Sequence, residues 1–504
     1  MASILLAARL LVLALLFAVV HAADRPVSPV VAPAPSATKA PAPFDPTSDR
    51  GRMLSRLGLP VPPPRAAPSN TTDESKALPA HSRLPDPLLL NNGQPVTTAA
   101  VWWQQRRAEI FEEFQRDIYG RIPANTPKVT WGITKTEDDG VVKTKTVVGK
   151  IDNSRFPALA PSIQLVVKTP SQAGGPVPLI VYASGGSFGG ARRGGPPPPG
   201  GAGQGAEGAS ATRPPATAAS TAASTAASTA AGAVFPARGG AGFGPGAGGR
   251  GPAGPSLETL TLAKGWGYAT FNTSSVQPDS AAGLTEGIIG LMNEGKMRAR
   301  PDEWGVLMAW AWGLSKSVDY FETDRDVDAQ QLAIDGFSRW GKTAVLAAAL
   351  EPRWALAWAG NSGQSGTKIN RRNFGETVDM VAQNFPWWMA GNFQKFFGNW
   401  EAMTVDSHEL VALVAPRPVF ITAGTTDLHC DPQGMFAAAA LASPVYELLG
   451  RKGLGAKTMP EPDVALVSGE LGFRLHTGGH TPAPDYATFL EFCGKYFAVR
   501  PSRG

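Results

Sequence analysis

Residues 331–350 read QLAIDGFSRWGKTAVLAAAL, and this stretch decides the fold of the chain. The apolar run 331–334 predicts a buried strand, and residues 342–350 predict a helix. Between them, two glycines bracket Ser338, so a strand passes into a helix through a tight turn. A strand, turn and helix in this order are typical of α/β proteins with a parallel sheet.

The turn has two incompatible interpretations. Gly336 to Thr343 satisfies the phosphate-loop pattern G-x-x-x-x-G-K-[ST], in which Lys342 contacts phosphates. The same residues can form a nucleophile elbow with Ser338 at its tip. The motif follows several predicted strands, whereas a phosphate loop usually follows the first strand of its domain. Residues 1–22 also predict export, as described below, and exported proteins rarely meet ATP or GTP. Both observations favour the elbow. Gly341 stands three residues after Ser338 rather than two, which weakens the elbow pattern.

Predicted strands and helices alternate on both sides of this unit. The strands are expected at residues 178–183, 268–272, 331–334, 354–359, 418–423 and 471–476. The helices are expected at residues 102–118, 303–315, 342–350, 432–441 and 485–497. The alternation predicts an α/β fold with a mainly parallel central sheet and helices on both faces.

The first 80 residues divide into an export signal and a spacer. Residues 1–22 place Arg9 before an apolar run of about 11 residues and end in small residues, which is typical of a cleavable export signal. The run is shorter than the roughly 20 residues that span a membrane, so a retained anchor is the less favoured alternative. Residues 23–80 are rich in proline and alanine, which predicts a disordered spacer before a catalytic domain at 81–504.

A second low-complexity segment interrupts that domain. The chain holds 57 glycines and 46 prolines, and residues 191–256 are especially rich in both, with a repeated Ser-Thr-Ala-Ala unit. We expect this segment to be a disordered surface insertion, because the cost of closing a loop grows slowly with its length.

Charge and cysteine content exclude several classes of protein. The chain has 46 basic and 41 acidic residues without a dense basic run, which argues against nucleic-acid binding. The only cysteines, Cys430 and Cys493, exclude a disulfide scaffold and a cysteine-based zinc site, although one bridge is possible.

A nucleophile elbow requires an acid and then a histidine further along the chain. His480 follows the predicted last strand and a Gly-Gly turn, where its imidazole can reach back over the sheet. The loop after strand 418–423 offers Asp427 and Asp431 as acids. Asp427 is nearer the strand, whereas Asp431 precedes a proline and predicts a helix N-cap.

The remaining histidines are expected to have structural roles. His476 and His480 are four residues apart, but Gly478 and Gly479 oppose a helix and no spaced carboxylate completes a metal motif. We therefore predict no metal site from them. His408 is expected to be a satisfied core histidine.

The motifs together resemble those of the bacterial glucuronoyl esterases of carbohydrate esterase family 15. The resemblance rests on Leu84-Pro85-Asp86-Pro87, Tyr119-Gly120-Arg121, Trp310-Ala311-Trp312-Gly313, Ser338-Arg339-x-Gly341-Lys342, Arg371-Arg372-Asn373-x-Gly375-Glu376-Thr377, Ala415-Pro416-Arg417-Pro418, Asp427-Leu428-x-x-Asp431-Pro432 and Gly478-Gly479-His480. It covers about 350 residues by the spacing of these motifs. The three-residue spacing between Ser338 and Gly341 is the family's own.

The resemblance implies an α/β-hydrolase that cleaves the ester between 4-O-methyl-glucuronic acid side chains of xylan and lignin alcohols. It implies that Ser338 is the nucleophile, His480 the general base and Arg339 a support for the oxyanion. Lys342 and Glu376 match positions that hydrogen-bond the uronic acid hydroxyls. No cofactor is implied, and we expect a monomer that is periplasmic or extracellular and not inserted in a membrane.

Two positions depart from the family pattern. Asn361 stands where many members carry the acidic residue of the triad, so we assign that role to Asp427. His429 stands where members commonly carry a tryptophan that packs on the sugar, and we expect Trp388, with Trp387, to supply an aromatic wall. Two alternatives are another exported esterase, such as an acetyl xylan esterase, and a carbohydrate-binding protein without activity.

Overall fold

The computed structural model describes residues 45–61, 72–77, 79, 83–185 and 254–497, all of which lie in one compact unit. The predicted export signal and almost all of the predicted insertion lie outside these residues. None of the described helices is long and apolar enough to cross a membrane.

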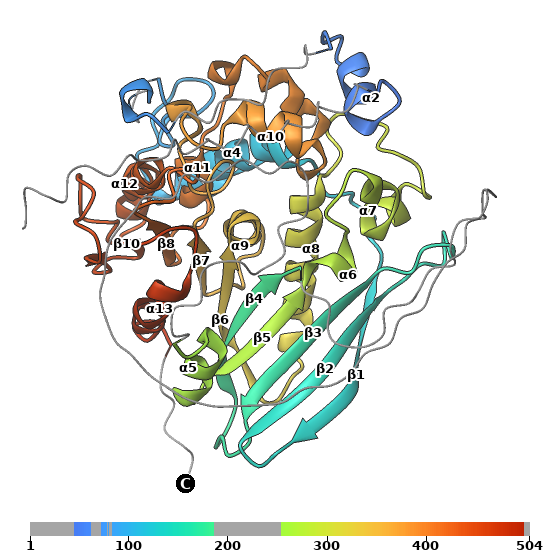
Figure 1. Cartoon of the computed structure of the whole chain (residues 1–504), viewed down its shortest axis with the longest axis vertical. Coiled ribbons are helices and arrows are strands. Elements are labelled where there is room, and N and C mark those ends of the chain that lie inside the picture. Colours follow the sequence, from blue (N-terminus) through green and yellow to red (C-terminus); the bar gives the residue numbers. More distant parts are fainter. Residues whose placement is uncertain (1–44, 62–71, 78, 80–82, 186–253, 498–504) are drawn as a thin grey trace, which may run out of the picture. The chain divides into compact units, whose positions relative to one another are not determined.

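A single ten-stranded sheet organises the unit (Figure 1), in the order β1-β2-β3-β5-β4-β6-β7-β8-β10-β9. Its strands are β1 Val129–Asp138, β2 Val142–Ile151, β3 Ser162–Pro170, β4 Val177–Ser184, β5 Gly267–Asn272, β6 Val327–Phe337, β7 Leu356–Gly360, β8 Val419–Gly424, β9 Ala465–Leu466 and β10 Leu471–His476. Parallel pairing joins the six neighbouring strands β5, β4, β6, β7, β8 and β10. Antiparallel pairing joins β1, β2 and β3 to one side of them and β9 to the other. The predicted mainly parallel sheet is therefore confirmed.

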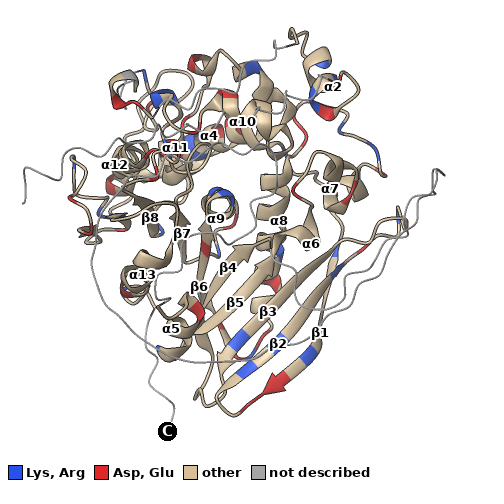
Figure 2. Ribbon diagram, viewed as in Figure 1, with Lys and Arg blue, Asp and Glu red and all other residues tan. Residues whose placement is uncertain are grey.

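Residues of the central strands alternate between two hydrophobic clusters, because successive side chains of a strand point to opposite faces. In β4, Leu179 and Val181 belong to the larger cluster, whereas Ile180 belongs to the smaller one. Figure 2 shows the positions of charged residues along β1 to β3, whereas β4 and β5 contain no charged residue. The central strands are thus buried on both faces and the antiparallel extension is more exposed.

Helices cover both faces of the sheet (Figure 1). The α-helices are α2 Asp49–Arg56, α3 Ala99–Val101, α4 Arg107–Glu113, α5 Leu257–Ala263, α6 Thr273–Val276, α7 Gly287–Met292, α8 Val306–Phe321, α9 Arg339–Leu350, α10 Val378–Asn384, α11 Ser407–Ala412, α12 Pro432–Leu448 and α13 Tyr486–Cys493. Short 3₁₀ helices include η1 Glu74–Lys76, η6 Pro386–Trp388 and η9 Ala483–Asp485. Residues of α5 and α13 pack in the smaller cluster, and residues of α8, α9, α11 and α12 pack in the larger one.

Several predicted helices have different ends in the structure. The helix expected at 303–315 is α8, which begins after Gly305 because the Glu303 carboxylate accepts hydrogen bonds from the backbone of the preceding turn. The helix expected at 485–497 is α13, which begins after Asp485 and ends at Cys493. The helix expected at 102–118 is one part of a helical run over 99–119 that includes two π-helical stretches.

The prediction that residues 23–80 form a disordered spacer is wrong for helix α2. Its Met53 and Leu54 are 1% and 2% exposed, and the Asp49 carboxylate pairs with the buried Arg298 guanidinium at 2.5 Å. The proline-rich composition around α2 does not predict a helix. The residue that stabilises α2, Arg298, lies about 250 residues further along the chain, so no local pattern reveals this contact.

The possible bridge between Cys430 and Cys493 does not form. Both thiols are free and buried, and they belong to the two different clusters on opposite faces of the sheet.

Candidate functional site

Ser338 lies at the tip of a strained turn between β6 and α9. Its backbone has φ 59° and ψ −127°, a conformation that residues other than glycine rarely adopt. A Cβ on Gly336 would lie 2.0 Å from the Trp340 carbonyl oxygen, and one on Gly341 would lie 2.8 Å from the Gly360 oxygen. Both glycines are therefore required for the close approach of strand and helix, as in a nucleophile elbow.

The phosphate-loop interpretation does not fit the side chains of this turn. The Lys342 ammonium donates to the Ser362 and Gln364 carbonyl oxygens at 2.6 and 2.7 Å and to Glu376 Oε2 at 2.6 Å. Thr343 is fully buried and its hydroxyl donates to the Arg339 carbonyl. Neither side chain is available to a phosphate or to magnesium, so the elbow is the correct interpretation. Because all three donors of the Lys342 ammonium bond to protein groups, the structure does not support the expected direct hydrogen bond from Lys342 to a uronic acid hydroxyl.

The structure brings His480 and Asp427 together beside the elbow. The distance from His480 Nδ1 to Asp427 Oδ2 is 2.7 Å, which assigns the proton to Nδ1 and leaves a lone pair on Nε2. The imidazole packs on Phe337, the neighbour of Ser338, with ring centroids 4.5 Å apart. Within the described residues no hydrogen bond joins His480 to Ser338, and such bonds often tighten only with substrate present.

The Asp427 carboxylate is held ionised in a buried position. Asn361 Nδ2 donates to the same Oδ2 atom at 2.7 Å, so the residue at the family's acid position supports Asp427. Burial raises the pKa of Asp427, but the hydrogen bond and charge of His480, with donors from Asn361 and Cys430, outweigh it and lower this pKa below its ordinary value.

A second histidine–carboxylate pair fixes the loop that carries His480. His476 Nδ1 bonds to Asp485 Oδ2 at 2.8 Å, and His476 Nε2 lies 3.1 Å from the Gly479 carbonyl oxygen. Arg474 also donates to the Asp485 carboxylate at 2.6 Å. Both His476 and Asp485 are fully buried, so this pair stabilises the loop and is not accessible to solvent.

Arg339 follows Ser338 and is held by three aromatic rings and one carboxylate. Its guanidinium pairs with Asp279 and lies 5.1 Å from the Trp388 ring centroid. The indole N–H groups of Trp387 and Trp388 donate to Asp279 Oδ1 at 2.9 and 2.6 Å. Trp388 is 2% exposed and stacks on Phe385, so of the two tryptophans Trp387 is the one that reaches the surface.

Glu376 and His429 lie next to each other beyond Lys342. Glu376 Oε2 accepts from Lys342 and from the Gln364 backbone amide, while Oε1 lies 4.0 Å from His429 Nε2. Burial raises the pKa of Glu376, but the charges of Lys342 and His429 lower it below its ordinary value. The His429 side chain is 41% exposed, so this part of the site opens to solvent.

Two residues of the site escape prediction from the sequence. Asp279 precedes Arg339 by 60 residues in a loop without a motif, and Cys430 Sγ lies 3.7 Å from His480 Nδ1. Only the fold brings either residue to the elbow, because neither lies within a periodic pattern that marks a site. By contrast, Asp431 caps α12, as the sequence predicts. His408 is buried as expected and its Nε2 bonds to the Pro85 carbonyl oxygen, but among the described residues its Nδ1 has no partner, so the histidine is only half satisfied.

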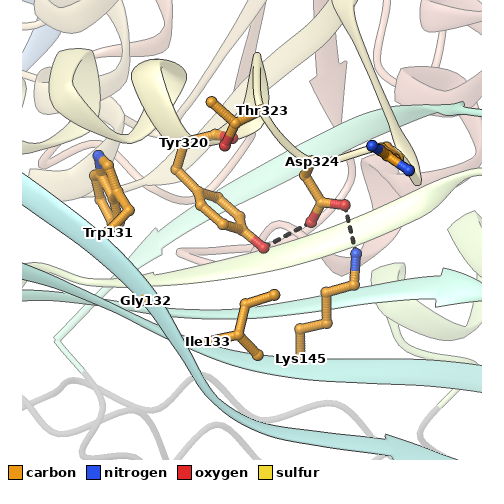
Figure 3. Close-up of a pocket in the computed structure, with 8 residues that line it drawn as sticks. Trp131, Gly132, Ile133, Lys145, Tyr320, Thr323 and Asp324 are labelled. Atoms are coloured by element: carbon orange, nitrogen blue, oxygen red, sulfur yellow. Dashed lines mark hydrogen bonds and ion pairs between the residues drawn. The ribbon is translucent and has the colours of Figure 1, made fainter.

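A separate pocket of about 510 Å³ lies between β1, β2 and the end of α8, near the first residues of β6 and therefore at the opposite end of that strand from Ser338. Figure 3 shows Lys145 and Tyr320 both directed to the Asp324 carboxylate across the pocket. As far as the described residues go, its lining includes no histidine, cysteine or serine. It therefore lacks the pairing of a serine with a histidine that is found beside the elbow.

Comparisons with known proteins point to one family. A family profile described as "Glucuronyl esterase, fungi" matches residues 257–450. A carbohydrate esterase named MZ0003, from an unknown prokaryotic organism, is 31% identical over 446 residues, which cover 87% of this chain and 95% of that protein. A 4-O-methyl-glucuronoyl methylesterase of Wolfiporia cocos is 24% identical over 420 residues, covering 80% of this chain and 82% of that protein.

A solved structure agrees with these relatives. The glucuronoyl esterase of family CE15 from Teredinibacter turnerae T7901 superposes with a TM-score of 0.71 at 30% identity, covering 89% of this chain and 98% of that one.

Proposed function

The chain belongs to the bacterial glucuronoyl esterases of carbohydrate esterase family 15, which are carboxylic ester hydrolases, and we propose that it cleaves glucuronate esters by serine chemistry. The substrate that we infer is the ester between 4-O-methyl-glucuronic acid branches of xylan and alcohols of lignin. The name of the Wolfiporia relative, a 4-O-methyl-glucuronoyl methylesterase, supports the acid part of this substrate.

One observation carries the proposal. His480 is bound to Asp427 through Nδ1 and lies against the residue before Ser338. Its side chain is 41% exposed to solvent, and none of the described residues hydrogen-bonds to Nε2. A base held through one ring nitrogen, with the other nitrogen available, is the arrangement that activates a serine hydroxyl.

In the acylation step, Ser338 Oγ attacks the ester carbonyl carbon and His480 Nε2 takes the hydroxyl proton. The ionised Asp427 stabilises the resulting imidazolium through Nδ1. As the tetrahedral intermediate collapses, the carbon–oxygen bond to the alcohol breaks and the alcohol receives the proton from Nε2. An acyl-enzyme on Ser338 remains.

In the deacylation step, His480 takes a proton from water, whose oxygen adds to the acyl carbonyl carbon. The bond to Ser338 Oγ then breaks, and the serine regains its proton from His480. The product is the free uronic acid, and no cofactor enters either step.

Arg339 stabilises the oxyanion in both steps, together with backbone amides at the start of α9. An ion pair with Asp279 and the stacked Trp388 hold the guanidinium, so little reorganisation is needed when charge develops. Asp279 and Trp388 are positioning residues in this proposal.

The uronic acid is recognised at Glu376 and His429. Lys342 anchors the Oε2 atom of Glu376. The Oε1 atom of Glu376 accepts a hydrogen bond from a sugar hydroxyl, which also contacts His429. Trp387, which is partly exposed, supplies the aromatic wall for the sugar. We further propose that the enzyme is exported through the signal at residues 1–22, in the periplasm or outside the cell, and is active as a monomer.

The test compares rates on a benzyl glucuronate ester and on an acetylated xylo-oligosaccharide, with Ser338→Ala as control. We expect a clear preference for the glucuronate ester and a loss of roughly 10⁴- to 10⁶-fold in Ser338→Ala. Preference for the acetyl ester would identify an acetyl esterase instead. A protein that a serine-directed phosphonate does not label at Ser338 would be a binding protein.

A further inference from the structure

We propose that Asp427, Cys430 and His480 form a binding site for a thiophilic divalent cation such as Zn²⁺, and that the bound ion switches the esterase off. The donor atoms of the three side chains all lie within 4.8 Å of one another. The regulatory part of the inference rests on the proposed function, because it acts through the catalytic histidine.

The distances are close to those of a tetrahedral zinc site. With Zn–S near 2.3 Å and Zn–N and Zn–O near 2.1 Å, neighbouring ligands lie roughly 3.4–3.6 Å apart. Cys430 Sγ already lies 3.7 Å from His480 Nδ1. The His480 Nδ1 to Asp427 Oδ2 distance of 2.7 Å must widen by about 0.7 Å, which a small turn of the imidazole provides.

The donor set has the chemistry that zinc prefers. A thiolate, an imidazole and a carboxylate supply three ligands, and water completes the fourth position. Cys430 and Asp427 are 3% and 6% exposed, so two ligands are fixed by the fold. The His480 side chain is 41% exposed, so its movement gives the ion a path from solvent to the site.

Metal binding exchanges a proton for the cation in a balanced way. The Cys430 thiol proton leaves to solvent, and the single ring proton of neutral His480 moves through solvent from Nδ1 to Nε2. The thiolate, the carboxylate and the neutral imidazole then coordinate one Zn²⁺. The oxidation state of every group stays the same. Binding therefore reverses when a chelator removes the ion.

The ion inactivates the enzyme by fixing the wrong tautomer of His480. With metal on Nδ1, the ring proton lies on Nε2, the nitrogen that must accept the Ser338 proton. The base is lost, although Ser338, Glu376 and His429 are not themselves ligands of the ion. Zn²⁺ should therefore lower kcat and leave KM nearly unchanged.

The sequence does not predict this site, because it contains no cysteine-rich motif and His480 is widely separated from Asp427 and Cys430 along the chain. Cys430 comes from the loop before α12, and His480 from the loop after β10. The parallel pairing of β8 with β10 brings the two loops together at one edge of the sheet.

The first experiment uses Co²⁺ as a spectroscopic probe, because a thiolate ligand gives a charge-transfer band in the near ultraviolet. The matched variants are Cys430→Ser and Cys493→Ser, since Cys493 is the other thiol of the chain and is buried on the opposite face of the sheet. We expect the band in the wild type and in Cys493→Ser, its loss in Cys430→Ser, and displacement of cobalt by Zn²⁺. A wild type without the band, or an unchanged band in Cys430→Ser, overturns the site.

The second experiment measures inhibition of ester hydrolysis by Zn²⁺, relative to the metal-free rate of each variant. We expect a fall in kcat at constant KM in the wild type, full recovery with a chelator, and at least a tenfold higher half-inhibitory concentration in Cys430→Ser. Cys430→Ala serves as a second variant if the serine protein does not fold. Competitive inhibition, or equal sensitivity of the two cysteine variants, contradicts the switch.

The two experiments separate this inference from the proposed function. The cobalt band does not depend on activity, so a wild type that shows the band without glucuronate esterase activity supports the metal site while contradicting the proposed substrate.

Discussion

Two histidine–carboxylate pairs, whose histidines lie four residues apart in the chain, have nearly the same nitrogen–oxygen distance, yet only one of them is exposed enough for the catalytic role that we propose. The nitrogen–oxygen distances are 2.7 Å for His480 and Asp427 and 2.8 Å for His476 and Asp485. The His480 side chain is 41% exposed, whereas His476 is fully buried.

The pairs differ in the second ring nitrogen and in the second donor to the carboxylate. Among the described residues, His480 Nε2 has no hydrogen-bond partner, whereas His476 Nε2 faces the Gly479 carbonyl. A neutral amide, Asn361, supports Asp427, but the Arg474 cation neutralises Asp485. A catalytic pair is therefore recognised by a free nitrogen and an uncompensated carboxylate, and the histidine–carboxylate contact alone is not sufficient.

The largest difference between the pairs should appear when each histidine is removed. We expect His480→Ala to lower kcat by roughly 10⁴-fold or more, because the base is lost. His476→Ala should keep kcat within several-fold of the wild type and lower the melting temperature, because a buried hydrogen-bonded pair is broken. Rates are measured below both melting temperatures, with circular dichroism as the check on folding. A His476 variant that is folded but inactive would remove the distinction.

The second donors give a smaller contrast. Asn361→Ala should lower kcat by about tenfold, because Asp427 loses one hydrogen bond that holds it against His480. Arg474→Ala should leave kcat within about threefold and lower the free energy of unfolding by about 1–3 kcal/mol, because Asp485 becomes a buried carboxylate without its cation. Urea unfolding and steady-state rates on the same samples measure both. Equal losses of kcat in the two variants would contradict the assignment.

The smallest expected effect is a pH dependence of stability from His476. Burial lowers the pKa of His476, but the hydrogen bond and charge of Asp485 outweigh it and raise this pKa above the ordinary value of 6.5. A raised pKa in the folded state stabilises the protein below pH 6.5, and this contribution is lost as the pH rises through the raised value.

The matched comparison is the wild type against His476→Gln. The difference in their free energies of unfolding should be larger at pH 5.5 than at pH 8.5, because only the wild type carries the charged pair. Urea unfolding at the two pH values measures it, and a difference that grows with pH would show that the charged pair does not stabilise the fold.

The sequence predicts the elbow and the pair beside it because local chemistry determines both. Gly336 and Gly341 stand where a side chain would collide with the backbone, and His480 follows the last long strand in a glycine turn. The predicted partner Asp427 lies within hydrogen-bonding distance of His480 in the structure.

Other parts of the site depend on contacts between distant segments, which no local pattern reveals. Asp279 joins Arg339 to two tryptophans more than 100 residues further along the chain. Trp388, expected as a wall for the sugar, is buried behind Arg339 for this reason. The same applies to α2, whose buried Asp49 finds its cation in Arg298.

The central claim is that Asp427, supported by Asn361, is the acid that acts with His480. The most direct test measures kcat on a benzyl glucuronate ester for Asp427→Asn and Asp485→Asn, each at a temperature where the variant is folded. We predict a loss of about 10⁴-fold in Asp427→Asn and of less than tenfold in Asp485→Asn. An Asp427→Asn enzyme that keeps a tenth or more of the wild-type kcat would contradict the account.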